Sequence, residues 1–245
     1  MMVAERRRVD QELVERGLAT SRERAQALLR AGLVRLEGEP VTRPDQPVSH
    51  DQRLELAGTR DYVSRGAEKL EAALAGFAVE VTDRVCLDVG ASTGGFTEVL
   101  LRHGAAKVMA VDVGYGQLAW SLRQDDRVVV MERVNIRHLD QLPIPADLAV
   151  IDVSFISLRL VLPRIRELLS PPGEVIALVK PQFEVGKGAV GKGGVVRDAG
   201  QHQMVLDQLT EFARDLRYQV KGQIPSPILG AKGNREFFIH LLADA

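Results

Sequence analysis

The stretch Val85-Cys-Leu-Asp-Val-Gly-Ala-Ser-Thr-Gly-Gly-Phe-Thr97 decides the fold. A short apolar run passes through a glycine-rich turn into a segment of helical periodicity, which predicts a strand, a tight loop and a helix. This is the ligand-facing corner of a doubly wound α/β domain. Gly90, Gly94 and Gly95 let the backbone turn sharply and approach a ligand closely, and Asp88 at the strand end can accept hydrogen bonds from an amine.

The glycine spacing indicates the class of ligand. It reads G-x-x-x-G-G, so it does not match the dinucleotide fingerprint G-x-G-x-x-G. Asp112 closes the next apolar run, 22 residues after Gly90, where a carboxylate would hold a ribose diol. These features favour S-adenosylmethionine (SAM) over a nicotinamide cofactor. The alternative is a structural glycine turn with two solvated acids.

Composition excludes several classes of protein. The 245 residues contain no apolar run of membrane-spanning length, and the charged N-terminus lacks the apolar core of a signal peptide. The single cysteine, Cys86, allows no disulfide within the chain and makes a metal cluster implausible. We therefore expect a cytoplasmic protein, a monomer without a membrane anchor or metal. The formal net charge of −1 carries no overall signature of a nucleic-acid binder.

Cations are used unevenly along the chain. It contains 25 arginines and only 7 lysines, and the first lysine is Lys69. Because lysine is so scarce, each lysine position is a candidate for a role that arginine would not fill.

Residues 62–245 alternate regularly between apolar runs and helical patterns. Strands are predicted over 85–89, 107–111, 127–131, 147–151 and 174–179, and helices over 158–169 and 202–216. This predicts a parallel, Rossmann-like sheet with helices on both faces, completed by an antiparallel pair over 218–224 and 236–242. Asp152 and Lys180 end the fourth and fifth strands, where ligands of such sheets bind. A salt bridge at the sheet rim is the alternative.

Residues 1–60 read as a separate module, with a linker at about 58–63. Two short helices and two short strands, over 33–36 and 54–56, predict a small α+β domain. Its helical half carries seven arginines that could pair with phosphates: Arg6, Arg7, Arg8, Arg16, Arg22, Arg24 and Arg30. Eleven arginines stand against ten acids there, so charge alone leaves a solvated surface as probable as an RNA face.

The loop over 186–194 resembles a phosphate-binding loop but fails its pattern. Gly193 stands where a serine or threonine would hold magnesium, and no helix follows directly. ATP binding is rejected. A mobile loop over the active-site mouth, with Lys187 and Lys192 touching substrate phosphates, fits better.

Two resemblances add to this reading. The pattern Arg8-Val-Asp-x-x-Leu-Val-x-x-Gly-Leu-Ala-x-Ser-Arg, continued to Val34, resembles the RNA-binding domain named after ribosomal protein S4. From Tyr62 onward, long motifs such as Ile151-Asp-Val-Ser-Phe-Ile-Ser-Leu and Val179-Lys-Pro-Gln-Phe-Glu-Val-Gly-Lys are similar to the TlyA family, also labelled haemolysin A. That family joins an S4-like domain, here 1–60, to an FtsJ-type methyltransferase, here 61–245. A departure is Ala67, where a second glycine after Gly66 is expected.

The resemblance implies 2′-O-methylation of ribosomal RNA (rRNA), at cytidine in one or both subunits, by a Lys-Asp-Lys-Glu set. Matched residue by residue, the set falls on Lys69, Asp152, Lys180 and Glu236. The strand–loop stretch and the resemblance together place the cofactor against Asp88, Gly90, Ser92, Gly94, Gly95, Phe96, Asp112, Asn135 and Asp152.

The expected mechanism assigns a role to each member of the set. Lys180 would take the hydroxyl proton, which requires surroundings that favour a neutral amine, because free lysine has a pKa of about 10.4. Asp152 would orient Lys180 and the methyl-bearing cation, and Lys69 and Glu236 would fix the hydroxyl. The alternatives are a haemolysin-like membrane-active protein, a non-catalytic RNA-binding factor of ribosome assembly and, last, a nicotinamide dehydrogenase.

Overall fold

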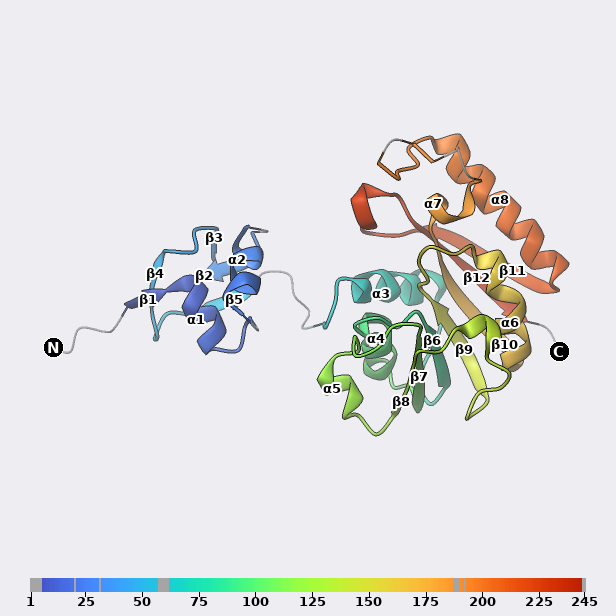
Figure 1. The fold of residues 1–245 in the computed structure, drawn as a ribbon, viewed down its shortest axis with the longest axis horizontal. Coiled ribbons are helices and arrows are strands. Elements are labelled where there is room, and N and C mark those ends of the chain that lie inside the picture. The colour runs from blue at the N-terminus through green and yellow to red at the C-terminus, as the bar shows by residue number, and fades with distance from the viewer. Residues whose placement is uncertain are drawn as a thin grey trace. The chain divides into compact units, whose positions relative to one another are not determined.

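The computed structural model describes residues 6–19, 21–30, 32–56, 62–186, 190–191 and 193–243. The chain divides into two compact units, Met1–Asp61 and Tyr62–Ala245, which are described separately (Figure 1). Lys187 and Lys192, which were expected to contact phosphates, lie outside the described residues, as does the linker over 58–61. No helix in the described ranges is long and apolar enough to cross a membrane.

The smaller unit contains two helices and five strands of three residues each. The helices are α1 (Val9–Glu15) and α2 (Arg22–Arg30), and the strands are β1 (Arg6–Arg8), β2 (Val34–Leu36), β3 (Glu39–Val41), β4 (Pro47–Ser49) and β5 (Leu54–Leu56). The antiparallel order β3-β2-β5 forms one sheet, and β1 pairs with β4. Leu13, Leu29, Val34 and Val48 form the core, so the helices and both sheets share one apolar interior.

Two expectations for this unit are corrected. Arg6, Arg7 and Arg8 were placed on its helical half, but they form the exposed strand β1. Strands β3 and β4 lie between the two predicted strands, where no strand was predicted, because three residues are too short to show an alternating pattern.

The larger unit is built on a seven-stranded sheet of order β11-β12-β10-β9-β6-β7-β8. The strands are β6 (Val85–Val89), β7 (Lys107–Asp112), β8 (Val128–Glu132), β9 (Ala146–Ile151), β10 (Leu169–Val179), β11 (Tyr218–Pro225) and β12 (Phe237–Ala243). β6 to β10 are parallel, and β12 runs antiparallel between β10 and β11. The predicted parallel sheet with an antiparallel C-terminal pair is confirmed.

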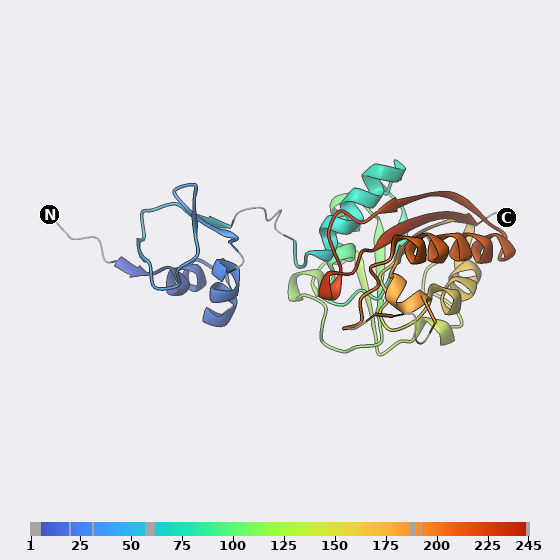
Figure 2. The same ribbon diagram turned by 90° about the horizontal axis from the view of Figure 1, so that it is seen from above.

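Helices cover both faces of this sheet. They are α3 (Gly66–Phe77), α4 (Gly95–Arg102), α5 (Trp120–Arg123), α6 (Leu162–Leu168), α7 (Pro181–Glu184) and α8 (Ala199–Asp215), with 3-10 turns η1 (Ile136–His138), η2 (Leu158–Leu160) and η3 (Ala231–Gly233). Figure 2 shows α3 and α8 on opposite sides of the strands. The alternation along β6 explains this arrangement, since Leu87 packs with the α6 and α8 side and Cys86 with the α3 and α4 side.

Two predicted elements differ in extent. The helix over 158–169 is divided into η2 and α6, and the strand predicted from Glu174 begins earlier, at Leu169. Pro171-Pro172 lies inside β10, where the register against β9 shifts between Leu169 and Glu174. The strand tolerates prolines there because the irregular pairing leaves no regular ladder bond for them to break.

Candidate active site

The loops after β6, β7 and β9 enclose two neighbouring cavities. The first has a volume of about 330 Å³ and is lined by residues that include Ser64, Lys69, Gly95, Phe96 and Gly230. The second has a volume of about 510 Å³ and lies toward β7 and η1. Gly90, Ser92 and Asp152 line both cavities, so the two spaces adjoin at the carboxyl ends of β6 and β9.

Gly90 allows these loops to meet. Its φ is +85°, and a Cβ atom at this position would lie 2.6 Å from the carbonyl oxygen of Asp152. Both the positive φ and the close backbone approach require glycine. The loop after β6 is therefore pressed against the end of β9, which brings Asp152 to the shared wall.

The second cavity combines an apolar lining with one oriented carboxylate. Val89, Val111 and Ile136 supply apolar surface, and Asp112 and Asn135 are among its polar residues. Backbone N–H groups of Ser92 and Gly114 donate to the two oxygens of Asp112, at 2.8 and 2.7 Å. Each carboxylate oxygen keeps a further lone pair, so Asp112 can still accept hydrogen bonds from a diol.

Lys180 and Asp152 form an ion pair where β10 and β9 end. Lys180 Nζ lies 2.6 Å from Asp152 Oδ1. Lys180 also donates a hydrogen bond to Ser154 Oγ, at 2.8 Å. Ser154 therefore sets the direction of the amine while Asp152 contributes charge. Ser154 was not among the predicted site residues, although it lies two residues after Asp152 in the motif that begins at Ile151.

Lys69 and Glu236 form a second pair. Lys69 Nζ lies 2.6 Å from Glu236 Oε2, with the side chains 12% and 2% exposed, so Glu236 is not a solvated strand-end acid. A Cβ atom at Gly230 would overlap the Glu236 carboxylate. Position 230 must therefore be glycine for the segment before η3 to pass Glu236 and line the first cavity beside Lys69.

Asp88 does not line either cavity, which differs from its expected contact with a ligand amine. Its fully buried side chain accepts a hydrogen bond from Thr97 Oγ1 at 2.6 Å, and its other oxygen has no partner among the described residues. Burial raises the pKa of Asp88 to about 7, assisted by the charges of Asp152 and Asp112 and opposed by hydrogen bonds from Thr97. Asp88 therefore has a structural role beneath the glycine loop that follows β6.

The other expected cofactor residues divide into two groups. Ser92, Gly95, Phe96 and Asn135 line one or both cavities. Gly94 does not, and a Cβ atom there would overlap the side chains of Leu118 and Leu122, so its glycine is required for packing. Ala67, where a second glycine was expected, is a buried residue in the first turn of α3.

The seven arginines expected at an RNA face have different surroundings. Arg8 and Arg22 donate to Asp10, and Arg7 pairs with Glu15. Arg16 is mostly buried, binding Glu12 at 2.8 Å and the backbone carbonyls of residues 49, 50 and 52. Arg6, Arg24 and Arg30 are exposed. Arg16 therefore stabilises the small unit and is not available to phosphates.

Comparison with known proteins assigns each unit to a family. The FtsJ-like methyltransferase family matches residues 62–242, and the S4 domain matches residues 7–54. The chain is 51% identical to the 16S/23S rRNA (cytidine-2′-O)-methyltransferase TlyA of Mycobacterium tuberculosis, over 98% of this chain and 91% of that protein. It is 39% identical to hemolysin A of Brachyspira hyodysenteriae, over 96% and 99% of the two chains.

A solved structure is similar over nearly the whole chain. A protein described as a hemolysin of Streptococcus thermophilus is 46% identical, with a TM-score of 0.78 over 99% of this chain and 90% of that one. These matches confirm the resemblance to the S4 and FtsJ-like families and to proteins named TlyA and hemolysin A.

Proposed function

Because the chain belongs to the FtsJ-like methyltransferase family, we propose that it transfers a methyl group from SAM to the 2′-hydroxyl of a cytidine ribose in rRNA. The similar protein TlyA is named for this reaction on 16S and 23S rRNA. The observation that carries the proposal is structural. Two amine–carboxylate pairs, Lys69–Glu236 and Lys180–Asp152, each contribute one side chain, Lys69 and Asp152, to the lining of the first cavity, and a more apolar cavity adjoins it.

The second cavity fits SAM. Adenosine needs an apolar slot with a few oriented polar groups, and the ribose needs a hydrogen-bond acceptor, which Asp112 provides. When bound, SAM supplies a methyl group on a positively charged sulfur. Asp152 lines both cavities, so its carboxylate can stabilise positive charge at their junction.

Lys180 is the proposed general base. A ribose hydroxyl is a weak nucleophile at neutral pH, so it must lose its proton as the new C–O bond forms. In its neutral form, Lys180 donates an N–H to Ser154 and keeps one lone pair, which the Ser154 contact orients. The proton from the hydroxyl passes to that lone pair.

Lys69 positions the hydroxyl in this proposal. Its ammonium group has three N–H donors, and the bond to Glu236 uses one of them. The others face the first cavity, where they can hold a ribose oxygen. Glu236, held by Gly230, fixes Lys69 without contacting the substrate.

The small unit, 1–61, is proposed to bind structured RNA, and the large unit, 62–245, to carry out methyl transfer. Arg6, Arg24 and Arg30, together with Lys187 and Lys192 outside the described residues, are the proposed phosphate contacts, since such contacts position an enzyme without reading sequence. A substrate in ribosomes or their precursors places the protein in the cytoplasm.

The test uses the purified full-length protein, radiolabelled SAM, and separately the small subunit, the large subunit and the two naked rRNAs. We expect label in at least one of these, and mass spectrometry of the digested RNA should identify 2′-O-methylcytidine. SAM binding without methyl transfer to any of them would refute the proposal.

The matched control is Lys180→Ala, which should bind SAM and RNA but transfer no methyl group. If this variant restored subunit assembly in cells as well as the wild type does, a non-catalytic assembly factor would be the better description.

A further inference from the structure

Two large aromatic side chains are exposed on one segment of the methyltransferase unit. Trp120 and Tyr115, between β7 and the start of α5, are 74% and 69% exposed. The chain has only one tryptophan and three tyrosines, and Tyr218 shows that it buries aromatic rings elsewhere. Single exposed apolar residues are ordinary on protein surfaces, but two aromatic rings on one short segment indicate a contact surface.

An arginine from a neighbouring loop stacks on this segment. The guanidinium carbon of Arg133 lies 4.2 Å from the centre of the Tyr115 ring. Arg133 has a φ of +57°, and its backbone N–H donates to the carbonyl of Gly114 at 3.0 Å. This bond joins the loop after β8 to the loop after β7, so the stacked pair is held by the backbone.

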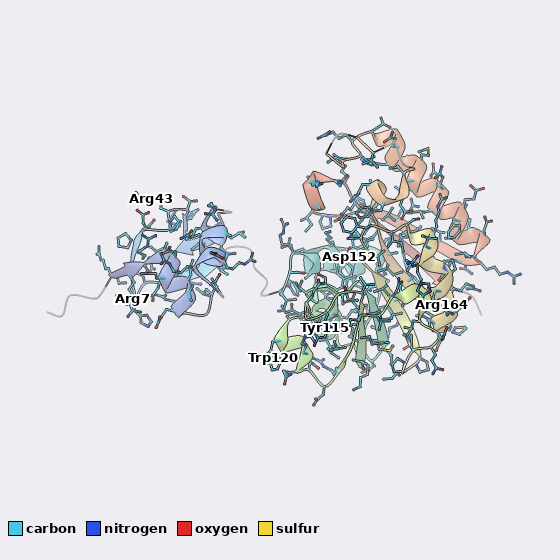
Figure 3. The ribbon with its side chains drawn as sticks, viewed as in Figure 1. Arg7, Arg43, Tyr115, Trp120, Asp152 and Arg164 are labelled. Carbon is cyan, nitrogen blue, oxygen red and sulfur yellow. The ribbon has the colours of Figure 1, made fainter. Side chains whose placement is uncertain are left out.

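The surface begins at the rim of the second cavity. Val113 and Gln117, from the same segment, line that cavity, and Val113 is itself exposed. Figure 3 labels Tyr115 and Trp120 on the part of the unit that carries α5. A molecule reaching the cavities from this side would pass over the aromatic rings.

The charged side chains near the two exposed rings indicate which class of molecule binds there. Arg133 and Arg137 are exposed, whereas the acid at the end of β8, Glu132, is neutralised by Arg123. Aromatic rings beside guanidinium groups are the features that bind unpaired nucleotides, because bases stack on flat surfaces while arginine neutralises phosphates. A membrane or an apolar protein would require a continuous apolar patch, but Gly116 and Gln117 separate the two rings.

We propose that Tyr115, Trp120 and Arg133 form a base-stacking surface for unpaired nucleotides of the RNA substrate, next to the methyl-transfer cavities. This inference rests on the proposed function, since it assumes that the substrate is RNA. It adds that the large unit contacts RNA bases outside the target nucleotide, independently of the S4-like unit.

The single tryptophan makes the test direct, because all tryptophan fluorescence comes from Trp120. The full-length protein is titrated with transcribed fragments of both rRNAs and with a short oligocytidine. We expect quenching of the fluorescence and protection from acrylamide. In filter binding at fixed salt, Trp120→Ala should weaken RNA affinity about tenfold, the effect of losing one stacked base, with SAM affinity unchanged.

Two variants serve as controls. Trp120→Phe should retain RNA affinity close to wild type, because phenylalanine still stacks. Leu160→Ala removes another exposed apolar side chain, on η2, and should leave RNA binding unchanged. Equal loss of affinity in Leu160→Ala and Trp120→Ala would overturn the inference.

Other outcomes are also decisive. Unchanged Trp120 fluorescence at saturating RNA, in a preparation that transfers methyl groups, would refute the stacking surface and leave the proposed function intact. A blue shift with phosphatidylglycerol vesicles but no response to RNA would refute it in favour of membrane contact. Quenching by RNA without any methyl transfer would support the surface while the proposed function failed.

Discussion

The buried acids of the small unit and the acids at the cavities of the large unit pair with different cations. In the small unit, arginines hold buried carboxylates: Arg8 and Arg22 bind Asp10, and Arg16 binds Glu12. At the cavities of the large unit, lysines take this place, in Lys69–Glu236 and Lys180–Asp152. Since guanidinium stays protonated and an amine can lose a proton, arginine suits permanent structural pairs and lysine suits proton transfer. Two of the chain's seven lysines, Lys69 and Lys180, are therefore at the proposed site of chemistry.

Asp88 extends the comparison, because it is a buried acid that pairs with no cation among the residues that the structure describes. Hydrogen bonds from Thr97 only partly offset its burial, and its pKa rises to about 7. In the small unit, burial would also raise the pKa of Asp10, but hydrogen bonds from Arg8, Gln26 and Arg22 outweigh it and hold the pKa far below its usual range. Asp88 and Asp10 should therefore give the stability of their units opposite dependences on pH.

The largest expected effect comes from replacing Lys180 with arginine, the residue that pairs with buried acids in the small unit. Lys180→Arg should lower kcat at least about 10²- to 10⁴-fold, because the arginine cannot accept the hydroxyl proton. SAM affinity, measured by calorimetry, should stay close to wild type. Methyl transfer near the wild-type rate would remove Lys180 as the base and end the distinction between the two kinds of pair.

The reverse test concerns Arg16, which was expected to bind RNA. Arg16→Ala should destabilise the small unit by about 4 kcal/mol, since it leaves the buried Glu12 without its main cation. Hydrogen exchange of amides in α1 and β5 of the full-length protein measures this loss.

Arg24→Ala is the matched variant, because Arg24 is exposed on α2. It should change stability little but lower the salt dependence of RNA binding by about one phosphate contact. Equal stability of the two variants would show that Arg16 is not structural.

A smaller effect concerns pH. The folded-state pKa of Asp88 lies above the unfolded value, so its contribution to the free energy of unfolding is complete below about pH 4 and is lost as pH rises through 7. Between pH 5.5 and 8 the large unit should lose about 2 kcal/mol from this group. Urea unfolding of wild type and Asp88→Asn measures it: the difference between them should change with pH in that direction.

In the small unit, two buried acids make stability depend on pH in the opposite direction. The pKa values of Asp10 and Glu12 are lowered, despite burial, by hydrogen bonds from Arg8 and Arg16 among others, so their stabilisation is lost as pH falls below about 4. Hydrogen exchange followed separately in the two units should show acid weakening the small one first. A parallel response of both units would contradict the comparison.

The smallest expected effect tests Ser154, which orients Lys180. Ser154→Ala should lower kcat about tenfold, equivalent to one hydrogen bond of about 1.4 kcal/mol, and leave the KM values for SAM and RNA unchanged. Ser154→Thr should restore most of the rate, because its hydroxyl can still accept from the amine. A raised KM for RNA without a change in kcat would make Ser154 a binding residue.

The sequence alone was enough to predict where the sheet's main strands lie along the chain and the glycine loop after β6. These depend on local periodicity and on backbone turns, which neighbouring residues encode. The motifs also indicated the family, as the matches to the FtsJ-like and S4 families confirm. Local periodicity could not predict three-residue strands such as β3 or the division of the helix before β10. Elements this short contain too few residues to show a period.

Only the tertiary structure decided which charges meet. Lys69 and Glu236 are 167 residues apart in the sequence, and Arg16 binds carbonyls more than 30 residues away. A pattern of charges records which residues are present but not their partners, because packing brings distant segments together. That Arg16 stabilises its own unit, that Asp88 lies beneath the loop and that Ser154 aims Lys180 therefore follow from the fold alone.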